Sequence, residues 1–167
     1  WQVPSNISSG TTLNVTATAT DTNSLPYSGN TSLTLTISPT FYLASNGVTI
    51  KCSGCSAGDT GMVSGTIYTA ADNSNITSLR NAGNFNLATT LVTGMSNLFS
   101  GNTSFNTDIS FWDTSNVKTM RSMFNGALNF NSDLHFNTKN LEITAYMFYN
   151  AISFNKDISK FNVSKVI

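Results

Sequence analysis

The sequence predicts a β-rich mixed fold, in which a solenoid of 24–25-residue coils follows a β-sandwich fragment. Each coil is expected to contain a short strand and a short helix. Three observations lead to this prediction: a seven-residue segment recurs, hydrophobic residues recur with it in fixed columns, and polar and apolar residues alternate near the N-terminus. Self-similarity at such a period indicates units that stack on one another.

The recurring segment occupies residues 104–110 and returns at residues 129–135 and 153–159, so the period is 25 and then 24 residues. The columns slip by one residue between Leu134 and Phe136, which indicates that a loop absorbed a deletion while the core spacing was kept. The residues predicted to lie in the interior are Phe99, Phe105, Met123, Phe124, Phe130, Leu134, Met147, Phe148, Phe154 and Ile158.

Within one coil, the apolar residues between Val117 and Ala127 follow helical spacing, and residues 130–136 are predicted to be extended. A strand and a short helix in each coil is the layout of a leucine-rich-repeat solenoid. A helical bundle is disfavoured because its helices would be only about ten residues long.

We expect three regions. Residues 1–40 form the end of an immunoglobulin-like β-sandwich with strands at 12–20 and 31–37, where apolar residues alternate with Thr and Asn. Residues 41–86 form a junction and an N-terminal cap, with strands at 47–52 and 65–70 and a short helix through Leu79 and Ala82, which residues 73–75 cap and Gly83 ends. Residues 87–167 form the repeats, which we expect to continue beyond Ile167 because no polar cap ends them.

The composition disfavours a charge-driven partner. Only 10% of the residues are charged and the formal net charge is zero, so the sequence offers no long-range attraction for nucleic acid or an anionic membrane. Ser, Thr and Asn supply 69 residues, a composition typical of exported surface proteins. No apolar run has the length of a membrane span.

Cys52 and Cys55 are the two cysteines. They form a disulfide in an oxidising compartment or remain as two free thiols. A zinc site is disfavoured because zinc needs about four ligands and the single histidine, His135, lies far away in a repeat.

Two polar columns run through the repeats. We expect the asparagines to hydrogen-bond backbone groups in the turns, and the aspartates to do the same. The alternative for the aspartates is calcium, which takes oxygen ligands but usually needs more carboxylates than one per coil. His135 has no nucleophilic partner, so no catalytic site and no cofactor other than this calcium alternative is predicted. The columns are Asn106, Asn131 and Asn155, and Asp108, Asp133 and Asp157.

Residues 112–124, with residues 130–134 after them, resemble the repeat unit of BspA-like leucine-rich-repeat surface proteins. Residues 47–52, 58–61 and 67–70 are similar to the junction that precedes such arrays in large exported proteins of Bacteroidetes, particularly flavobacteria. The resemblance implies export to the cell surface, a role in adhesion and use of the type IX secretion route. Residues 136–141 depart from the repeat pattern.

The sequence therefore predicts a non-enzymatic segment of a large exported adhesin whose solenoid binds a protein or a glycan on a surface. Its other expected partners are neighbouring domains of the same chain and the secretion machinery. The main alternative is a structural spacer or stalk, and a part of a glycan-active enzyme is a more distant one. Exposed aromatic or charged residues aligned on one face favour binding, whereas uniform Ser, Thr and Asn faces favour a spacer.

Overall fold

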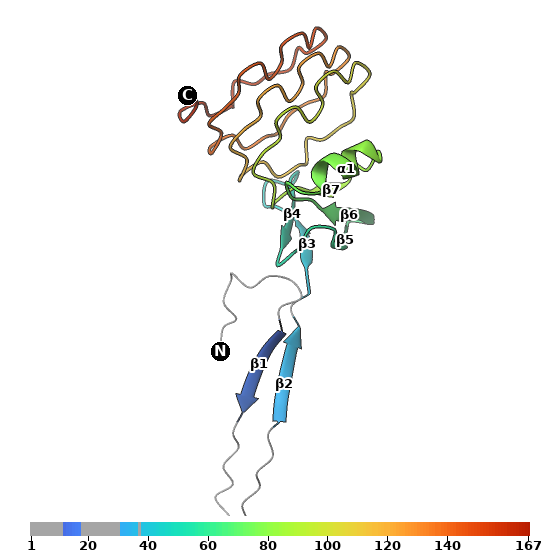
Figure 1. Ribbon diagram of the computed structural model, residues 1–167, viewed down its shortest axis with the longest axis vertical. Coiled ribbons are helices and arrows are strands. Elements are labelled where there is room, and N and C mark those ends of the chain that lie inside the picture. Colours follow the sequence, from blue (N-terminus) through green and yellow to red (C-terminus); the bar gives the residue numbers. More distant parts are fainter. Residues whose placement is uncertain (1–11, 18–30, 37) are drawn as a thin grey trace, which may run out of the picture.

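The computed structural model describes residues 12–17, 31–36 and 38–167 (Figure 1). Its strands and helix precede residue 89, and residues 89–167 follow as stacked coils of turns and isolated bridges. This arrangement confirms the β-rich mixed fold at a coarse level. The elements are β1 Thr12–Ala17, β2 Thr31–Thr36, β3 Thr40–Leu43, β4 Ile50–Ser53, β5 Thr60–Val63, β6 Thr66–Ala70, α1 Ile76–Asn81 and β7 Leu87–Ala88.

Strands β1 and β2 form an antiparallel pair in which Leu13 stands opposite Leu35 and Val15 opposite Leu33. Strands are thus present at residues 12–17 and 31–36, within the strands predicted at 12–20 and 31–37. Residues 1–11, 18–30 and 37 of the predicted sandwich fragment lie outside the described residues.

The segment before the repeats forms two small sheets. β3 pairs antiparallel with β4, and β6 lies between an antiparallel β5 and a parallel β7. β4 and β6 occupy the strands predicted at 47–52 and 65–70, whereas β3 and β5 were not predicted. α1 occupies the predicted helix, which ends before Gly83, whose φ of 75° is left-handed. The parallel β6–β7 pair sets β6 beside the start of the first coil.

Gly61 in β5 is required by the packing of Phe41 in β3. A Cβ at Gly61 would lie closer to Cδ2 of the Phe41 ring than two carbons can approach. We therefore expect Gly61→Ala to lower the free energy of unfolding by about 1–3 kcal/mol through overpacking. Gly94→Ala is the control, because its Cβ would meet only a Thr119 methyl at 3.4 Å. Urea unfolding of both variants measures the difference, and equal stabilities would contradict this account.

The repeats stack in parallel, one coil upon the next (Figure 1). We number them as the first coil (residues 88–112), the second (113–136) and the third (137–161). Thr119 forms a parallel bridge with Gly94 of the first coil and another with Ile143 of the third. A backbone ladder extends this contact, with donor–acceptor distances of 2.7–2.9 Å. N–H groups of Met95, Asn97, Phe99 and Gly101 donate to the second coil, and those of Met120, Ser122, Phe124 and Gly126 donate to the third.

The short helix predicted in each coil is wrong, as is the placement of the extended segment. Residues 117–127 form turns and a bridge, and residues 130–136 are not a strand. The reason is that Ser122 and Gly126 have left-handed φ values of 54° and 70°, which interrupt a right-handed helix. The N–H groups of Ser122, Phe124 and Gly126 therefore donate to the third coil, and those of Met123 and Asn125 donate to carbonyls three positions earlier, so no helical bond to a residue four positions earlier forms.

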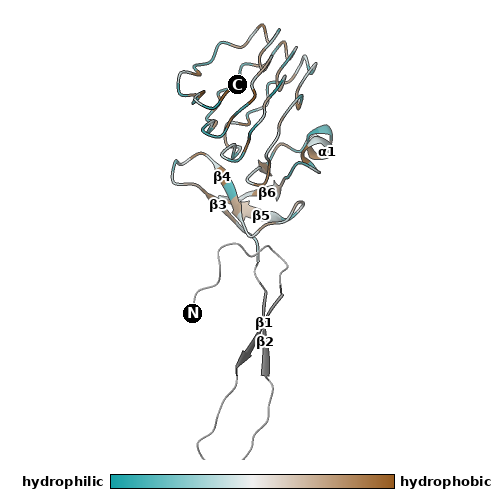
Figure 2. Ribbon diagram, turned by 60° about the vertical axis from the view of Figure 1, so that its left-hand side comes forward, coloured by the Kyte–Doolittle hydropathy of each residue, from teal (hydrophilic) through white to brown (hydrophobic). Residues whose placement is uncertain are grey.

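The hydrophobic columns form the core, as predicted, for the first two coils. Hydrophobic and hydrophilic residues alternate along each coil (Figure 2), and the hydrophobic columns of the first two coils are buried in one cluster. In the third coil Met147 is buried, Phe148 and Phe154 are only half-buried, and Ile158 is 40% exposed. The predicted interior position of Ile158 is therefore wrong, because no described coil covers that side of the third one. The buried predicted residues are Phe99, Phe105, Met123, Phe124, Phe130, Leu134 and Met147.

Two ladders of phenylalanine rings run through the stack. Phe99, Phe124 and Phe148 follow one another with ring centroids 5.6 Å apart and nearly parallel planes. The second ladder, which includes Phe130 and Phe154, has the same 5.6 Å spacing. The spacing shows that equivalent side chains keep one rotamer from coil to coil, which ties the sequence period to the register of the stack.

Candidate binding surface

The asparagine column links the coils through hydrogen bonds. The Asn106 side-chain oxygen accepts the N–H of Asn131 at 2.8 Å, and the Asn131 side-chain oxygen accepts the N–H of Asn155 at 2.9 Å. Each bond connects a side chain of one coil with the backbone of the next. The asparagine column therefore connects the turns of neighbouring coils at positions that the backbone ladder does not reach.

Asn131→Ala is expected to lower the free energy of unfolding by about 0.5–1.5 kcal/mol, since it removes one partly exposed hydrogen bond. The exposed Thr107 is the control, because its side chain makes no hydrogen bond to a described residue, and Thr107→Ala should change stability little. Thermal melts with calcium and with chelator separate this role from the calcium alternative. A melting temperature that rises with calcium, and no longer rises in Asp133→Asn, would refute a purely structural role for the two columns.

Sequence reasoning missed a second set of polar links. The buried threonines Thr89 and Thr114 donate hydroxyl hydrogen bonds to backbone carbonyls of the following coil, and buried Thr138 accepts the N–H of Asn162. Asn116 and Asn140 donate side-chain bonds of 2.8 Å back to the preceding coil. The sequence did contain a signal for these links, because the residues that form them also recur at intervals of 24–25 residues.

This pattern explains residues 136–141, which depart from the repeat in sequence. Asn137 replaces Asp113, yet both side-chain oxygens accept a backbone N–H two residues later, from Lys139 and Ser115 respectively. Thr138 and Asn140 keep their links to neighbouring coils. The departure therefore preserves the hydrogen-bond geometry.

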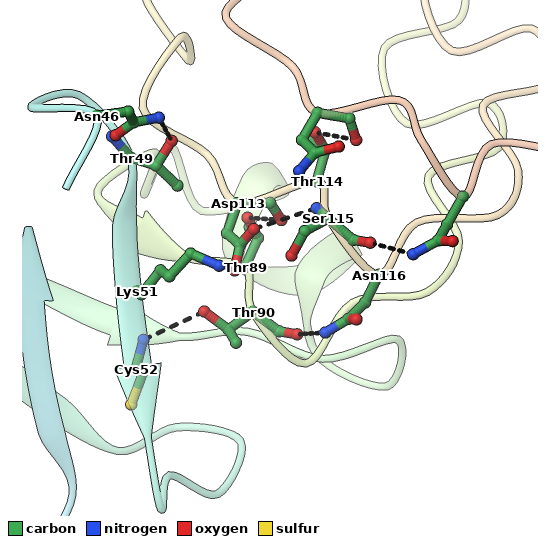
Figure 3. A network of polar contacts seen from close by, with 12 residues as sticks. Asn46, Thr49, Lys51, Cys52, Thr89, Thr90, Asp113, Thr114, Ser115 and Asn116 are labelled. Carbon is green, nitrogen blue, oxygen red and sulfur yellow. Dashed lines mark hydrogen bonds and ion pairs between the residues drawn. The ribbon is translucent and has the colours of Figure 1, made fainter. Parts of the chain in front are cut away.

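Asp113 has one partner that the later coils lack. Its carboxylate lies 3.1 Å from the Lys51 ammonium of β4, and its side chain is 2% exposed (Figure 3). Around this pair, β4 runs parallel to the end of the first coil, where Ile50 bridges Trp112, and the Cys52 N–H donates to the Thr90 hydroxyl. The pair joins the segment before the repeats to the stack.

The ionisation of Asp113 follows from these contacts. Burial alone would raise the pKa of this carboxyl group. Hydrogen bonds from Ser115 and the charge of Lys51 outweigh burial, so the pKa of Asp113 lies below its ordinary value of 3.8. Asp113 is therefore an anion at neutral pH.

Cys52 and Cys55 are joined in a disulfide, with Cα atoms 5.9 Å apart. Both are buried in a small cluster with Ile50, Ala70 and Ala88, which packs on Phe41 and Tyr68. The disulfide thus lies in the core of the segment before the repeats and not at its surface.

The aspartate column belongs to a surface that we call the charged strip. Asp108 and Asp157 each accept an N–H two residues later, from Ser110 and Ser159, at 2.8 Å, and the hydrogen bonds from Ser159 lower the pKa of Asp157. Asp133 instead lies 3.4 Å from the Lys156 ammonium. The charged strip consists of Asp108, Asp133, His135, Lys156, Asp157 and Lys160.

Two hollows along the strip share Asp133 and His135. The larger, of about 380 Å³, also has Asn46 and Val48 from the loop between β3 and β4 on its wall. The smaller, of about 240 Å³, includes Ser110 and Ser132. Together they present carboxylate, imidazole, hydroxyl and ammonium groups from three successive coils.

A second polar face shares no residue with the strip. It includes Lys118, which lies 3.9 Å from Glu142, and Lys165, which donates to the Asn140 side chain at 2.9 Å. Across the described residues, no three His, Cys, Asp or Glu side chains gather as a metal site would require. No helix in the same part of the chain is long and apolar enough to cross a bilayer.

A family model described as "Mycoplasma protein of unknown function, DUF285" matches residues 66–167. The predicted resemblance to BspA-like leucine-rich-repeat proteins is wrong, because this is the family whose model matches the repeats. The expectations of a Bacteroidetes source and type IX secretion lose their basis with it. No curated protein and no solved structure matches the chain.

Proposed function

We propose a function for this chain from the geometry of its repeats. The chain belongs to the family described as Mycoplasma protein of unknown function, DUF285. The repeats form an open solenoid that acts as a binding and adhesion module of an exported cell-surface protein. The module has no catalytic role, and its ligand is a protein or glycan on a surface.

The charged strip carries this proposal. Its six ionisable residues come from three coils and gather along two hollows that share Asp133 and His135, although only 10% of the chain is charged. A spacer needs no such concentration, because Ser, Thr and Asn suffice to solvate its faces. The carboxylates and ammonium groups nearly balance, which suits a neutral polar ligand better than a strongly charged one.

The buried disulfide supports export. Disulfides persist in oxidising compartments and are rare in the reducing cytosol. Because Cys52 and Cys55 are 4% and 7% exposed, their bond is a structural part of the core and not an accessible redox pair. Antibody labelling of intact cells tests the location, and labelling only after lysis would contradict export.

The binding role is tested by attaching the chain to beads and measuring retention on a glycan array and on a panel of immobilised surface proteins. We expect retention on at least one surface, and a loss of at least tenfold in Asp133→Ser/His135→Ser/Lys160→Ser. The matched control is Lys118→Ser/Glu142→Ser/Lys165→Ser, which changes three ionisable residues on the second polar face and should bind like the parent. Equal losses in both variants, or no retention by the folded parent, would refute a binding role for the strip.

The alternative is a spacer. The continuous backbone ladder and the buried threonine links favour it, because they join each coil to the next along the whole stack. A folded chain that binds no surface, and resists pulling along the stack in single-molecule force measurements, would favour this function.

A further inference from the structure

The larger hollow of the charged strip is lined by two parts of the chain that lie far apart in the sequence. Asn46 and Val48 line it from the loop between β3 and β4, and residues of the second and third coils line it from the stack. The coils recur along the sequence, but this loop belongs to the segment before them. The loop therefore gives the hollow a wall that the repeat pattern alone does not supply.

The loop wall is fixed by its own hydrogen bonds. The Asn46 side-chain oxygen accepts the N–H groups of Val48 and Thr49 at 3.1 and 3.0 Å. The Asn46 side-chain nitrogen donates to the Thr49 hydroxyl at 2.8 Å (Figure 3). Ile50, directly after the loop, forms a parallel bridge with Trp112 at the end of the first coil. The wall is therefore preorganised, so a ligand that enters the hollow does not have to order it first.

The coils contribute an apolar floor to the hollow. Leu134 and Phe136 alternate with Asp133 and His135 along the second coil, and Phe161 adds an aromatic ring from the third. Leu134 and Phe136 are 8% and 6% exposed, so they form the floor, and the exposed Asp133 and His135 form the rim. The volume of about 380 Å³ lies within the range of about 300–1,000 Å³ that is typical of small-molecule sites.

The charges of the two carboxylates at the hollow are compensated within the charged strip. Asp133 lies 3.4 Å from the Lys156 ammonium. Hydrogen bonds from Ser159 lower the pKa of Asp157, and the charge of Lys160 lowers it further. Each carboxylate therefore has an ammonium group that balances it. Because an ion of either sign gains little net attraction from such a site, the hollow favours an uncharged ligand.

The polar groups of the rim match a ligand that is rich in hydroxyl groups. A hydroxyl group both donates and accepts hydrogen bonds, so it needs acceptors and donors around it. The carboxylates of Asp133 and Asp157 accept, and the Lys160 ammonium donates. The His135 imidazole can do both when it is neutral. An uncharged sugar, which has hydroxyl groups at its edge and an apolar face of C–H groups, fits this rim and the apolar floor together.

The same lining disfavours a protein ligand in the hollow. The cores of protein interfaces are enriched in Tyr, Trp, Phe, Met and Arg and depleted of Asp and Lys. Of the enriched types only Phe lines the larger hollow, whereas Asp133, Asp157 and Lys160 belong to the depleted types. The lining is thus that of a site for a small polar ligand.

We propose that the larger hollow binds one ring of an uncharged glycan. The apolar face of the sugar packs on Phe136, and its hydroxyl groups exchange hydrogen bonds with Asp133, Asp157 and Lys160. The smaller hollow, which shares Asp133 and His135 and is lined only by polar residues, takes the next sugar unit. This inference rests on the proposed binding function and narrows its ligand from a protein or glycan to an uncharged glycan.

The probes are the uncharged disaccharides lactose, maltose, cellobiose, mannobiose and N,N′-diacetylchitobiose, with sialyllactose as the anionic counterpart of lactose. Saturation-transfer NMR with the whole chain measures their dissociation constants. We expect saturable binding of at least one uncharged disaccharide, with a dissociation constant that changes less than about twofold between about 0.05 and 0.5 M salt, because salt screens only charged ligands. Binding of sialyllactose alone, or an affinity that falls steeply with salt, would overturn the proposal.

The same measurement separates this inference from the proposed function. If no uncharged disaccharide binds, but the chain is still retained on an immobilised protein through the charged strip, the glycan site is refuted and the binding function stands. If the folded chain is retained on no surface and binds no disaccharide, both are refuted.

Two variants locate the sugar in the larger hollow. Val48→Arg places a long side chain in the hollow and keeps the backbone bond to Asn46, so it should weaken disaccharide affinity at least tenfold. Ser45→Arg is its matched control, since Ser45 is exposed in the same loop and does not line the hollow. Lys160→Met removes one donor and should weaken affinity at least threefold, whereas Lys165→Met on the second polar face should not. Circular dichroism checks that each variant is folded. Unchanged affinity in Val48→Arg, or equal weakening by the controls, would overturn the proposal.

Discussion

Phe124→Ala is expected to lower the free energy of unfolding by about 3–5 kcal/mol, as is typical when a large buried aromatic side chain is truncated. The Phe124 ring is fully buried, and it stacks 5.6 Å from both Phe99 and Phe148 and 4.0 Å from Phe130. Neighbouring coils are held in register by the backbone ladder, so they cannot collapse into the cavity. Urea unfolding followed by circular dichroism measures the loss.

Tyr149→Ala is the matched aromatic control. This side chain is 57% exposed, so its truncation should change the stability by about 0.5 kcal/mol or less. If the two variants lost similar stability, the ring ladder would not be the core of the repeats.

Lys51→Met is expected to lower the free energy of unfolding by about 3 kcal/mol at pH 7. The substitution keeps the aliphatic stem but removes the ammonium group 3.1 Å from Asp113, and it leaves a carboxylate that is 2% exposed without its counter-charge. Breaking a buried pair in this way typically costs about 3–5 kcal/mol. The lower end applies here because the Lys51 side chain remains 30% exposed, so solvent already screens the pair.

The same pair predicts a pH dependence. The folded-state pKa of Asp113 lies below 3.8, so its stabilising contribution is present above that pH and is lost as the pH falls through the folded-state pKa. Asp113→Asn should remove this part of the acid sensitivity, because an amide does not titrate. Asn137 shows that Asn can keep the turn hydrogen bond. Unfolding curves at pH 7, 5 and 3 test this, and identical pH profiles of the variant and the parent would contradict it.

The repeat columns were predictable from sequence because burial recurs with the period. Val92, Val117 and Leu141 share one column and are all buried. The conformation of each coil was not predictable in the same way. Apolar spacing at 117, 120, 124 and 127 fits a helix as well as a chain that turns at left-handed residues, and only the Gly101, Gly126 and Asn150 column hints at the second.

The candidate surface was predictable only in part. The asparagine and aspartate columns were visible as repeats, but their partners depend on which coil neighbours which side chain. Asp113 illustrates this point: its repeat equivalent is Asn137, so the period alone gives it no special role. Its pairing with Lys51 arises because β4 lies against the end of the first coil, a long-range contact that no local pattern encodes.

The backbone ladder has a direction that bears on the order in which the chain folds. The alternate N–H groups from Met95 to Gly101 and from Met120 to Gly126 donate to carbonyls of the next coil, which is synthesised later. β6 precedes the coils in the chain, and its parallel pairing with β7 at the start of the first coil offers a template as the polypeptide emerges from its N-terminal end. Each later coil then closes a loop of only about 25 residues, which keeps the entropy of closure constant however long the stack becomes. Growth of this kind proceeds by propagation between neighbouring coils rather than by a single global collapse, and a defect in one coil should weaken the template for the coil that follows it.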